Sequence, residues 1–515
     1  MNKTHLSLAI ALACSAAFVA APAAAAEPAL SFSKVWTFSH GPRVDAAVPA
    51  NPPLAEIVSF DSLNRNLWVA GVSGVDVINV TSGLRVGSRI DTTSFGSINS
   101  VAIHGGLAAF AIEASTKTNP GTVKLYDTAS RTAASGINSI TVGALPDMLT
   151  FTKDGTKLLV ANEATPTTYG ARTSASGAFP RTYGAAAVDP VGSVSIIDMG
   201  SRAVVATANP NGVTETGSHI RKNTGMDFEP EYIAVNAAGT KAFVTLQEAN
   251  AVGVLNLGTN TFDKVIGLGV KDFNAAGNQI DPLNNSSVSF QSVAAKGLYM
   301  PDGVSVFETG GATYMVLANE GDFREDDGDR SAASAVSSSN VSPLNNLRVS
   351  NTDSSGTDLY AAGARSFSIR DEDGVLVYDS GDILDKQAFE RGVYDDGRSR
   401  DKGVEPEGIE VMTIGDRTFA LVGLERTLKA AVGIFDITDP ANSTFVDMLV
   451  SDGDLSPEGL EGFTMDGNYY LAFSNEVSNT TSLYQLTAPI PEPETYALML
   501  AGLGLVAAMA RRRKK

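Results

Sequence analysis

The chain of 515 residues has a single cysteine and four histidines. Cys14 lies in an apolar N-terminal segment, and there is no second cysteine with which it can form a disulfide bond. The stability of the fold must therefore come from a hydrophobic core, which a chain of this length can build. The histidines are not spaced as zinc ligands. A Gly-x-Ser-x-Gly segment, a P-loop and a dinucleotide-binding glycine pattern are also missing, so the sequence carries none of these signatures of enzyme chemistry.

Positive charge is scarce as well. The 38 Lys and Arg residues stand against 57 Asp and Glu residues, which gives a net charge of −19. A protein of this sign repels nucleic acid and anionic lipid, and it suits bound cations or solubility outside a cell. Away from its two ends the chain has no long apolar stretch with a helical period, and it is rich in Gly, Ser, Thr, Asn and Val. This composition favours β-structure with many turns.

Residues 1–26 have the three parts of a secretory signal peptide. Lys3 supplies a positive charge, residues 6–20 are apolar, and residues 24–26 are alanines that form a small-residue cleavage site. We therefore expect export through the Sec pathway. The alternative is a lipoprotein signal cut at Cys14, which is disfavoured because the apolar run continues past this cysteine.

The segment 489–515 joins three features in a fixed order. Pro491-Glu492-Pro493 comes first, a short apolar run over residues 496–510 follows, and a cluster of Arg and Lys ends the chain. This pattern predicts a short transmembrane helix whose basic end stays in the cytoplasm. An ordinary tail anchor and a buried helix are the alternatives, and the basic cluster argues against burial. The order of the three features resembles the PEP-CTERM sorting tail of Gram-negative bacteria.

The resemblance of the tail implies a route for the protein. An exosortase-type membrane protease is expected to process it near the Pro-Glu-Pro motif. The protein would be anchored transiently in the inner membrane through its C-terminal helix, and then pass to the cell surface or the extracellular matrix.

Internal repetition predicts the fold of residues 31–487. Five copies open with proline and an acidic residue, followed by a short strand, a polar turn, a second strand that ends in Glu, and a third strand. They begin at Pro146, Pro230, Pro301, Pro406 and Pro457. Two weaker copies occupy residues 54–80 and 98–126. We therefore predict an all-β fold, a seven-bladed β-propeller of four-stranded antiparallel blades.

The last copy stops after three strands, whereas residues 32–38 form a separate strand-like run near the start of the body. A propeller needs its ends tied, because an open edge invites aggregation. We predict that residues 32–38 supply the outer strand of the last blade. A disordered N-terminal arm is the alternative, and it would expose Val35, Trp36 and Phe38.

The repeat also predicts where acidic side chains gather. Loops alternate between the two faces of a four-stranded meander, and the long insertions all belong to the face where inner strands begin. The same face receives the acids that open the inner strands and those that end the second strands. They are Asp147, Glu231, Asp302, Glu407 and Glu458 in the first group, and Glu113, Glu163, Glu248, Glu320, Glu425 and Glu476 in the second. We expect a crown of carboxylates around the mouth of the channel.

Crowded carboxylates repel one another unless a cation separates them, and Ca²⁺ prefers oxygen ligands of this kind. The candidate metal ligands are Glu231, Asp302, Glu320, Asp322, Glu407 and Glu458. The alternative is that the acids cap backbone N–H groups or pair with neighbouring Arg side chains.

Several segments across the body resemble the choice-of-anchor I family of exported bacterial propellers. They are Phe228-Glu-Pro-Glu-Tyr-Ile-Ala-Val, Ala318-Asn-Glu-Gly-Asp, Gly363-Ala-Arg-Ser-Phe-Ser-Ile, Val377-Tyr-Asp-Ser-Gly, Glu405-Pro-Glu-Gly-Ile and Val432-Gly-Ile-Phe-Asp-Ile-Thr-Asp-Pro. Some relatives carry an alkaline-phosphatase label, and propeller phytases are a looser parallel. Relatives often have more Asp in the insertions around Asp281 and Asn351, which weakens a calcium or phosphatase function here.

Two functions remain open at this stage. The first is a surface or matrix binding module, possible partners being an exopolysaccharide or a surface protein. The second is a Ca²⁺-dependent extracellular phosphohydrolase of the alkaline phosphatase or phytase type. The sequence shows no nucleophile paired with a base, which favours the binding module.

Overall fold

The protein is described by a computed structural model for residues 30–43, 55–168, 170–222, 228–323 and 328–488, together with Gly502. The predicted signal peptide and the Pro-Glu-Pro motif lie outside these residues, and so does the predicted C-terminal transmembrane helix apart from Gly502. Within the described part, no helix combines the length and the apolar character needed to cross a membrane. Residues Leu30–Ala488 form one compact unit.

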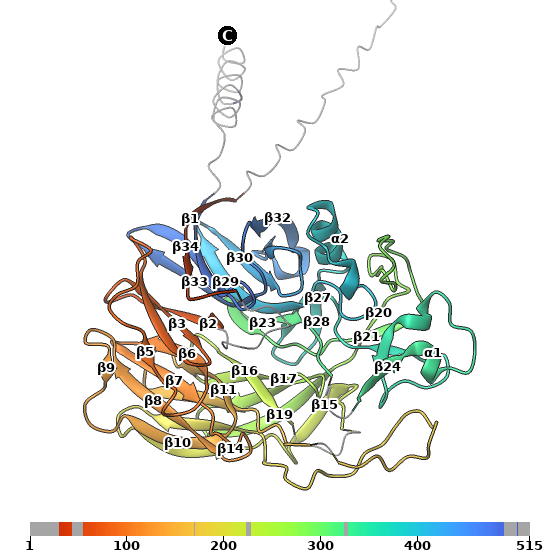
Figure 1. Cartoon of the computed structure of the whole chain (residues 1–515), viewed down its shortest axis with the longest axis horizontal. Helices are drawn as coiled ribbons and strands as arrows, with labels where there is room; N and C mark the ends of the chain where they lie inside the picture. The colour runs from red at the N-terminus through yellow and green to blue at the C-terminus, as the bar shows by residue number, and fades with distance from the viewer. Residues whose placement is uncertain are drawn as a thin grey trace, which may run out of the picture. The chain divides into compact units, whose positions relative to one another are not determined.

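Seven sheets, each built on four antiparallel strands, follow one another along this unit, which confirms the predicted all-β propeller (Figure 1). Blade 1 contains β2 (Ile57–Asp61), β3 (Asn66–Gly71), β4 (Gly74–Asn79) and β5 (Ile90–Asp91). Blade 2 contains β6 (Ile98–His104), β7 (Leu107–Ile112), β8 (Pro120–Asp127) and β10 (Ser139–Ala144), and β9 (Thr132–Ala133) also pairs with β8. Blade 3 contains β11 (Pro146–Phe151), β12 (Lys157–Asn162), β13 (Ser193–Asp198) and β14 (Ala203–Ala208).

The remaining blades follow the same order. Blade 4 contains β16 (Pro230–Val235), β17 (Lys241–Leu246), β18 (Ala251–Asn256) and β19 (Thr261–Leu268), and β15 (Thr214–Ser218) adds a parallel outer strand. Blade 5 contains β22 (Val304–Thr309), β23 (Ala312–Asn319), β27 (Ser366–Asp371) and β28 (Leu376–Asp379). Blade 6 contains β29 (Pro406–Ile414), β30 (Arg417–Leu424), β31 (Ala430–Asp436) and β32 (Thr444–Ser451). Blade 7 contains β33 (Pro457–Met465), β34 (Asn468–Asn475), β35 (Thr480–Thr487) and β1 (Ser31–Ser39).

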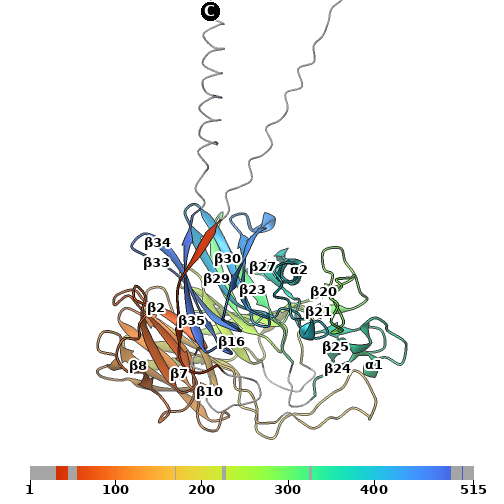
Figure 2. The ribbon, with the colours of Figure 1, turned by 45° about the horizontal axis from the view of Figure 1, so that its top comes forward.

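Strand β1 closes the ring, as the sequence predicted. It pairs antiparallel with β35 along almost its whole length, from Ser31 opposite Thr487 to Ser39 opposite Thr480. Figures 1 and 2 show this first strand beside the last blade. The indole of Trp36 in β1 donates a hydrogen bond to the carbonyl oxygen of Val80 in blade 1 over 2.7 Å. The closing strand therefore joins blade 7 to blade 1.

The hydrophobic core is divided among the interfaces between blades. Each of the seven interfaces contains its own cluster of buried apolar side chains, including the interface between blades 7 and 1. In the interface between blades 1 and 2, for example, the rings of Trp68 and Phe110 lie 6.1 Å apart. Inner strands contact their neighbours all the way round, and β33 contacts β2. The circle of packed sheets is therefore complete.

The long insertions form small elements of their own. Strands β20 (Val270–Asp272), β21 (Lys296–Leu298) and β26 (Tyr360–Ala361) make one sheet, and β24 (Arg330–Ala332) pairs with β25 (Arg348–Ser350). Helices α1 (Ala333–Val336) and α2 (Ile383–Glu390) and the 3₁₀ turns η1 (Leu344–Asn346), η2 (Asp396–Arg398) and η3 (Pro440–Asn442) complete the set. A separate apolar cluster around Phe273, Leu347 and Leu359 packs these insertions together. Figure 1 shows β20, β21, β24 and α1 gathered on one side.

Candidate functional site

A β-bulge places an acidic side chain at the start of several inner strands. In β11, β16, β29 and β33 the pairing with the second strand shifts by one residue within the first four residues. The residue before the proline adopts a positive φ in three of these strands, at Leu145, Glu405 and Ser456. A bulge bends its strand and redirects a side chain. The acid that follows each proline consequently lines the central cavity.

The cavity has a volume of about 880 Å³ and receives side chains from all seven blades. The acidic residues that line it are Glu56, Glu113, Asp147, Glu163, Glu231, Asp302, Glu320, Asp322, Glu405, Glu407, Glu425, Glu458 and Glu476. The predicted gathering of acids at one mouth of the channel is therefore confirmed for the inner-strand acids and for five of the six second-strand acids. In blade 4, Gln247 lines the cavity in place of the expected Glu248.

Glu405, which precedes Pro406, was not predicted from the sequence, and neither were two further parts of this cavity. The first is Glu56, which occupies the inner-strand position of blade 1 but follows Ala55 instead of a proline. The second is a group of basic side chains that also line the cavity, namely Arg330, Arg398, Lys402 and Arg426. Three of the four come from the long insertions, and no local pattern in the sequence marks them as neighbours of the channel.

Lys402 is buried and already serves as a counter-ion within the crown. Its Nζ lies 2.5 Å from Glu320 Oε1, 2.9 Å from Glu405 Oε2 and 3.5 Å from Asp322 Oδ1. The other oxygen of Glu320 accepts a hydrogen bond from the side-chain amide of Gln247 over 2.8 Å. Burial opposes the ionisation of Glu320, but the lysine outweighs it, so the pKa of Glu320 is lowered.

The other basic side chains are paired in the same region. Arg398 lies 2.5 Å from Glu405, and Arg426 lies 2.6 Å from Glu425. Outside the crown, Arg330 lies 3.0 Å from Asp401. Blades 5 and 6 and the loops beside them therefore carry both the cations of the cavity and the acids that bind them.

The remaining acids lack such partners. Among the described residues, no basic side chain forms an ion pair with Glu231, Asp302, Glu407 or Glu458. Burial and then neighbouring carboxylates raise the pKa of each of these four acids well above its ordinary value. The same two causes raise the pKa of Asp147 to about 7.

Tyr232 lies among these acids. Burial raises the pKa of its phenol well above the ordinary value, and the charges of Asp302, Glu458, Asp147 and Glu407, in decreasing order, raise it further. These four carboxyls come from four other blades, so the phenol lies near the centre of the ring. The carboxyls of four blades therefore act on the phenol of Tyr232.

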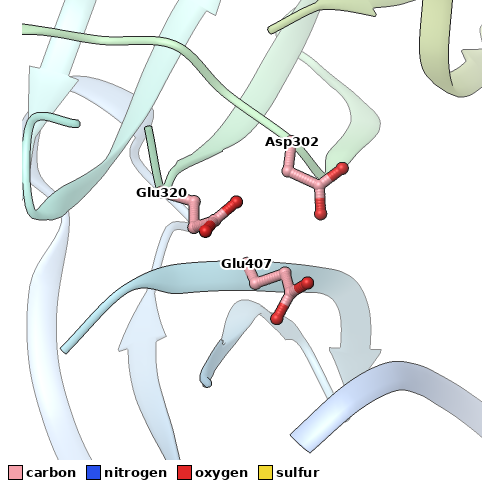
Figure 3. A group of neighbouring side chains, drawn as sticks. All are labelled: Asp302, Glu320 and Glu407. Atoms are coloured by element: carbon pink, nitrogen blue, oxygen red, sulfur yellow. The ribbon is translucent and has the colours of Figure 1, made fainter. Parts of the chain in front are cut away.

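Two groups of three carboxyls come close enough to share a cation. Asp302, Glu320 and Glu407 each offer one oxygen within 4.8 Å of the other two, and Figure 3 shows the three carboxylates turned toward a common space. Glu320, Glu405 and Glu425 form the second group. The second group surrounds Lys402 and borders Arg426, so protein cations already neutralise it.

The capping alternative applies to different acids. Glu461 in β33 accepts a hydrogen bond from the backbone N–H of Phe60 in blade 1 over 3.1 Å, and Glu410 in β29 accepts one from Gly462 in blade 7. For the described residues, no backbone group donates to the carboxylates of Glu231, Asp302 or Glu407. Of the six predicted metal ligands, the structure brings Asp302, Glu320 and Glu407 together, pairs Asp322 with Lys402, and places Glu231 and Glu458 elsewhere on the cavity wall.

Fold and site together define a closed seven-bladed propeller with an acid-lined channel mouth. The profile of the choice-of-anchor I domain matches residues 56–440, and that of the PEP-CTERM protein-sorting motif matches residues 489–514. The chain belongs to the choice-of-anchor I family, as the resemblance predicted. The sorting motif indicates an exported bacterial protein that is anchored at the cell surface, and it implies membrane anchoring and processing by an exosortase.

Two solved structures are similar to this chain at low identity. Hydrazine synthase of Kuenenia stuttgartiensis has a TM-score of 0.49 and 11% identity, over 86% of this chain and 98% of that chain. The Pan2 WD40 domain of Neurospora crassa has a TM-score of 0.46 and 10% identity, over 90% of this chain and 96% of that chain. No curated protein matches the chain.

Proposed function

We propose that this exported propeller is a non-catalytic binding module whose channel mouth holds a divalent cation, Ca²⁺ in the extracellular setting. Asp302, Glu320 and Glu407 are the ligands. The observation that carries the proposal is the convergence of the three carboxylates within 4.8 Å, two of them without a basic partner among the described residues. Ca²⁺ takes six to eight oxygen ligands and accepts carboxylates together with water, so three acids suit it.

The electrostatics of the site support the same proposal. Burial and neighbouring acids raise the pKa values of Asp302 and Glu407, which means that the ionised forms are unfavourable without a cation. A divalent ion would relieve this repulsion and would lower both pKa values. Cation binding should therefore strengthen as the pH rises and these carboxyls lose their protons.

The other candidate function is a Ca²⁺-dependent phosphohydrolase. A phosphate ester would meet thirteen acidic and four basic residues in the cavity, and the basic ones are already paired with acids. Such a cavity repels an anion unless bound cations reverse its charge. A phosphatase assay with Ca²⁺ and with a chelator separates the two functions, and turnover that requires Ca²⁺ would replace the binding module by the enzyme.

Calcium binding is tested by titrating the purified protein with CaCl₂ in a calorimeter. We expect saturable binding that the double variant Asp302→Asn/Glu407→Gln abolishes. The control is Asp416→Asn, since Asp416 is exposed in the turn at the far end of β29 and its replacement removes a negative charge away from the cavity. Equal binding by the double variant and the control, or no binding at pH 8, would refute the proposal.

Thermal unfolding gives an independent measurement. If Asp302 and Glu407 bind Ca²⁺, the double variant should lose the Ca²⁺-dependent rise in melting temperature that the natural protein shows. In chelator the variant should melt at least as high as the natural protein, because two repelling charges are gone. An equal loss of stability with and without Ca²⁺ would indicate a purely structural role.

The N-terminal and C-terminal segments of the chain indicate how this module is delivered. We propose Sec export, transient anchoring in the inner membrane and release to the cell surface or the matrix of a Gram-negative bacterium, where a polysaccharide or a surface protein is the partner. The Pro491-Glu492-Pro493 motif supports this route. Replacing Glu492 with Ala should leave the protein in the membrane fraction, which immunoblotting of cell fractions would show.

A further inference from the structure

The acids on the two sides of the cavity have different surroundings. Beside blades 5 and 6, Lys402, Arg398 and Arg426 form ion pairs with the crown. Beside blades 2, 3 and 4, the carboxyls of Glu113, Asp147 and Glu231 form neither an ion pair nor a side-chain hydrogen bond with any described residue. Glu163 differs from these three in accepting a hydrogen bond from Thr165, and the charge of Lys117 partly offsets the rise of its pKa that burial causes. This second group is called the open carboxyls below.

Glu231 indicates that the open carboxyls are built to meet a ligand. Its side chain lines the cavity although the residue is only 9% exposed, and its Oε2 has no hydrogen-bond partner within the described ranges. A buried carboxyl without a partner costs free energy that the fold would ordinarily avoid. The charges of Glu248, Asp302, Glu163 and Asp147 add to this cost. A bound cation would remove both contributions.

The spacing of the open carboxyls favours a cation larger than a metal ion. Among the described residues, both groups with three oxygens within 4.8 Å contain Glu320, and neither contains an open carboxyl. An ammonium group with two N–H···O bonds of about 2.8 Å each can bridge oxygens that lie about 5 Å apart. Lys402 provides the internal example, because its ammonium joins a carboxylate at the end of a second strand to one that precedes an inner strand.

The wall beside the open carboxyls also suits an alkyl chain. Met148 and Tyr232 line the cavity next to Asp147 and Glu231 in the sequence and in space. Methylene groups pack well on a thioether and an aromatic ring, and an ammonium is attracted to an aromatic face. The combination of several acids with these two side chains matches a ligand that carries ammonium groups on a flexible hydrocarbon chain.

We propose that the open carboxyls bind a linear polyamine, with its ammonium groups paired to Asp147, Glu163 and Glu231 as Lys402 is paired to Glu320 and Glu405. This site goes beyond the calcium site and does not rest on it, since the two sites have different residues. A lysine side chain of another protein carries the same chemical group, so the experiment includes both sources.

The test titrates the full-length protein with spermidine in a calorimeter at pH 8 in chelator. We expect saturable binding that weakens at least tenfold in the double variant Asp147→Asn/Glu231→Gln. Binding should weaken less than threefold in Asp302→Asn/Glu407→Gln and should be unchanged in Asp416→Asn. The calcium titration is run on the same variants, so that failure of one site is distinguishable from failure of the other.

A charge-conserving variant and a second ligand complete the test. Asp147→Glu keeps the charge and should retain binding, which separates the loss of a ligand from misfolding, and circular dichroism verifies the fold of each variant. A tetralysine peptide replaces spermidine in a parallel titration. Binding of the peptide alone would overturn the polyamine as the ligand, and equal spermidine binding by the double variant and the natural protein would overturn the site itself.

Discussion

His40 Nδ1 lies 2.9 Å from Asp76 Oδ2, and this contact ties the end of the closing strand to blade 1. The other ring nitrogen of His40 lies 2.8 Å from the hydroxyl of Thr481 in β35, so one buried imidazole joins the two blades that meet at the closure. Arg89 also bonds to both residues, through the carbonyl oxygen of His40 at 2.6 Å and Oδ2 of Asp76 at 3.1 Å. The arrangement of acid, imidazole and hydroxyl resembles a catalytic triad, but all three residues are buried, so it serves the structure.

This network predicts a pH-dependent loss of stability when Asp76 is replaced. Burial opposes ionisation of Asp76, but hydrogen bonds from His40 and Arg89 hold its pKa at about 2, below the ordinary 3.8. Because folding lowers this pKa, ionised Asp76 stabilises the folded state at pH values above the ordinary pKa of 3.8. This contribution is lost as the pH falls from 3.8 toward 2. We expect Asp76→Asn to cost about 2 kcal/mol near pH 6 and much less near pH 2, measured by urea unfolding.

The control for this prediction is Asp466→Asn. Asp466 forms an exposed ion pair with Arg65 at 2.9 Å, and such a pair contributes at most about 1 kcal/mol. If both variants lose the same stability at pH 6, the closure network has no special role.

Trp36 should matter more than any other side chain of β1. Its ring packs so closely against Gly83 that a Cβ on this glycine would lie 2.8 Å from the ring. Its indole N–H donates a hydrogen bond to the carbonyl oxygen of Val80. We expect Trp36→Ala to lower the free energy of unfolding by about 2 kcal/mol or more. Val35→Ala in the same strand removes a side chain of a residue that is 44% exposed and should change it little. Similar losses in the two variants would contradict the role of Trp36 in closure.

Lys402→Met should destabilise the crown and change its metal binding. Removing one partner of a buried ion pair typically costs about 3–5 kcal/mol, and here Glu320 and Glu405 both lose their ammonium. Glu320, Glu405 and Glu425 would then form a second metal site, so added Ca²⁺ should restore part of the lost stability. Melting curves with and without Ca²⁺ measure both effects.

Lys429→Met is the matched control for this change. Lys429 pairs with Asp452 at the surface over 2.6 Å, and its loss should cost less than about 1 kcal/mol. A Lys402→Met protein that melts like this control, with no response to Ca²⁺, would show that the ammonium is not a structural counter-ion.

Glu461→Gln should stabilise the protein at high pH. Burial raises the pKa of Glu461 to about 7, because the hydrogen bond from Phe60 compensates only in part. A raised acid pKa means that stability is greatest at low pH and falls as the pH rises from the ordinary 4.5 toward 7. Glutamine keeps the acceptor for Phe60 without the charge, so we expect a higher melting temperature at pH 8 and no change at pH 4. Glu372→Gln, at a surface pair with Lys241, should not show this pH-dependent gain.

Much of the fold could be predicted from the sequence because the signals that define it are local. Five blades repeat a proline with an acid, a tight turn and a strand that ends in Glu, and two weaker copies repeat the order of strands and turns. These short signals predicted all seven blades and the closing strand. Glu56 was missed because Ala55 stands where five other blades have the proline. The sequence therefore predicted the acids that follow a proline and five of the six second-strand acids, and it missed Glu56 and Glu405.

The basic partners of the crown acids could not be predicted from the sequence, because these ion pairs join residues that are far apart in the chain. Lys402 reaches Glu320 across 82 positions of the chain, and Arg330 reaches Asp401 across 71. Asp322, in one of the long insertions, was expected to be a metal ligand, whereas it pairs with Lys402. In the same insertion Asp329 pairs with Arg221. Such roles depend on how the insertions pack, and that packing has no repeat to reveal it.

The seam between β1 and β35 sets the order of events during biogenesis. Strand β1 is synthesised first and its partner β35 some 440 residues later, so neither strand can pair until β35 has been made. During secretion the early blades consequently remain unsealed until the final one has crossed the membrane. A prematurely terminated product would keep an exposed sheet edge and would be more susceptible to proteolysis, so the topology favours the survival of complete molecules.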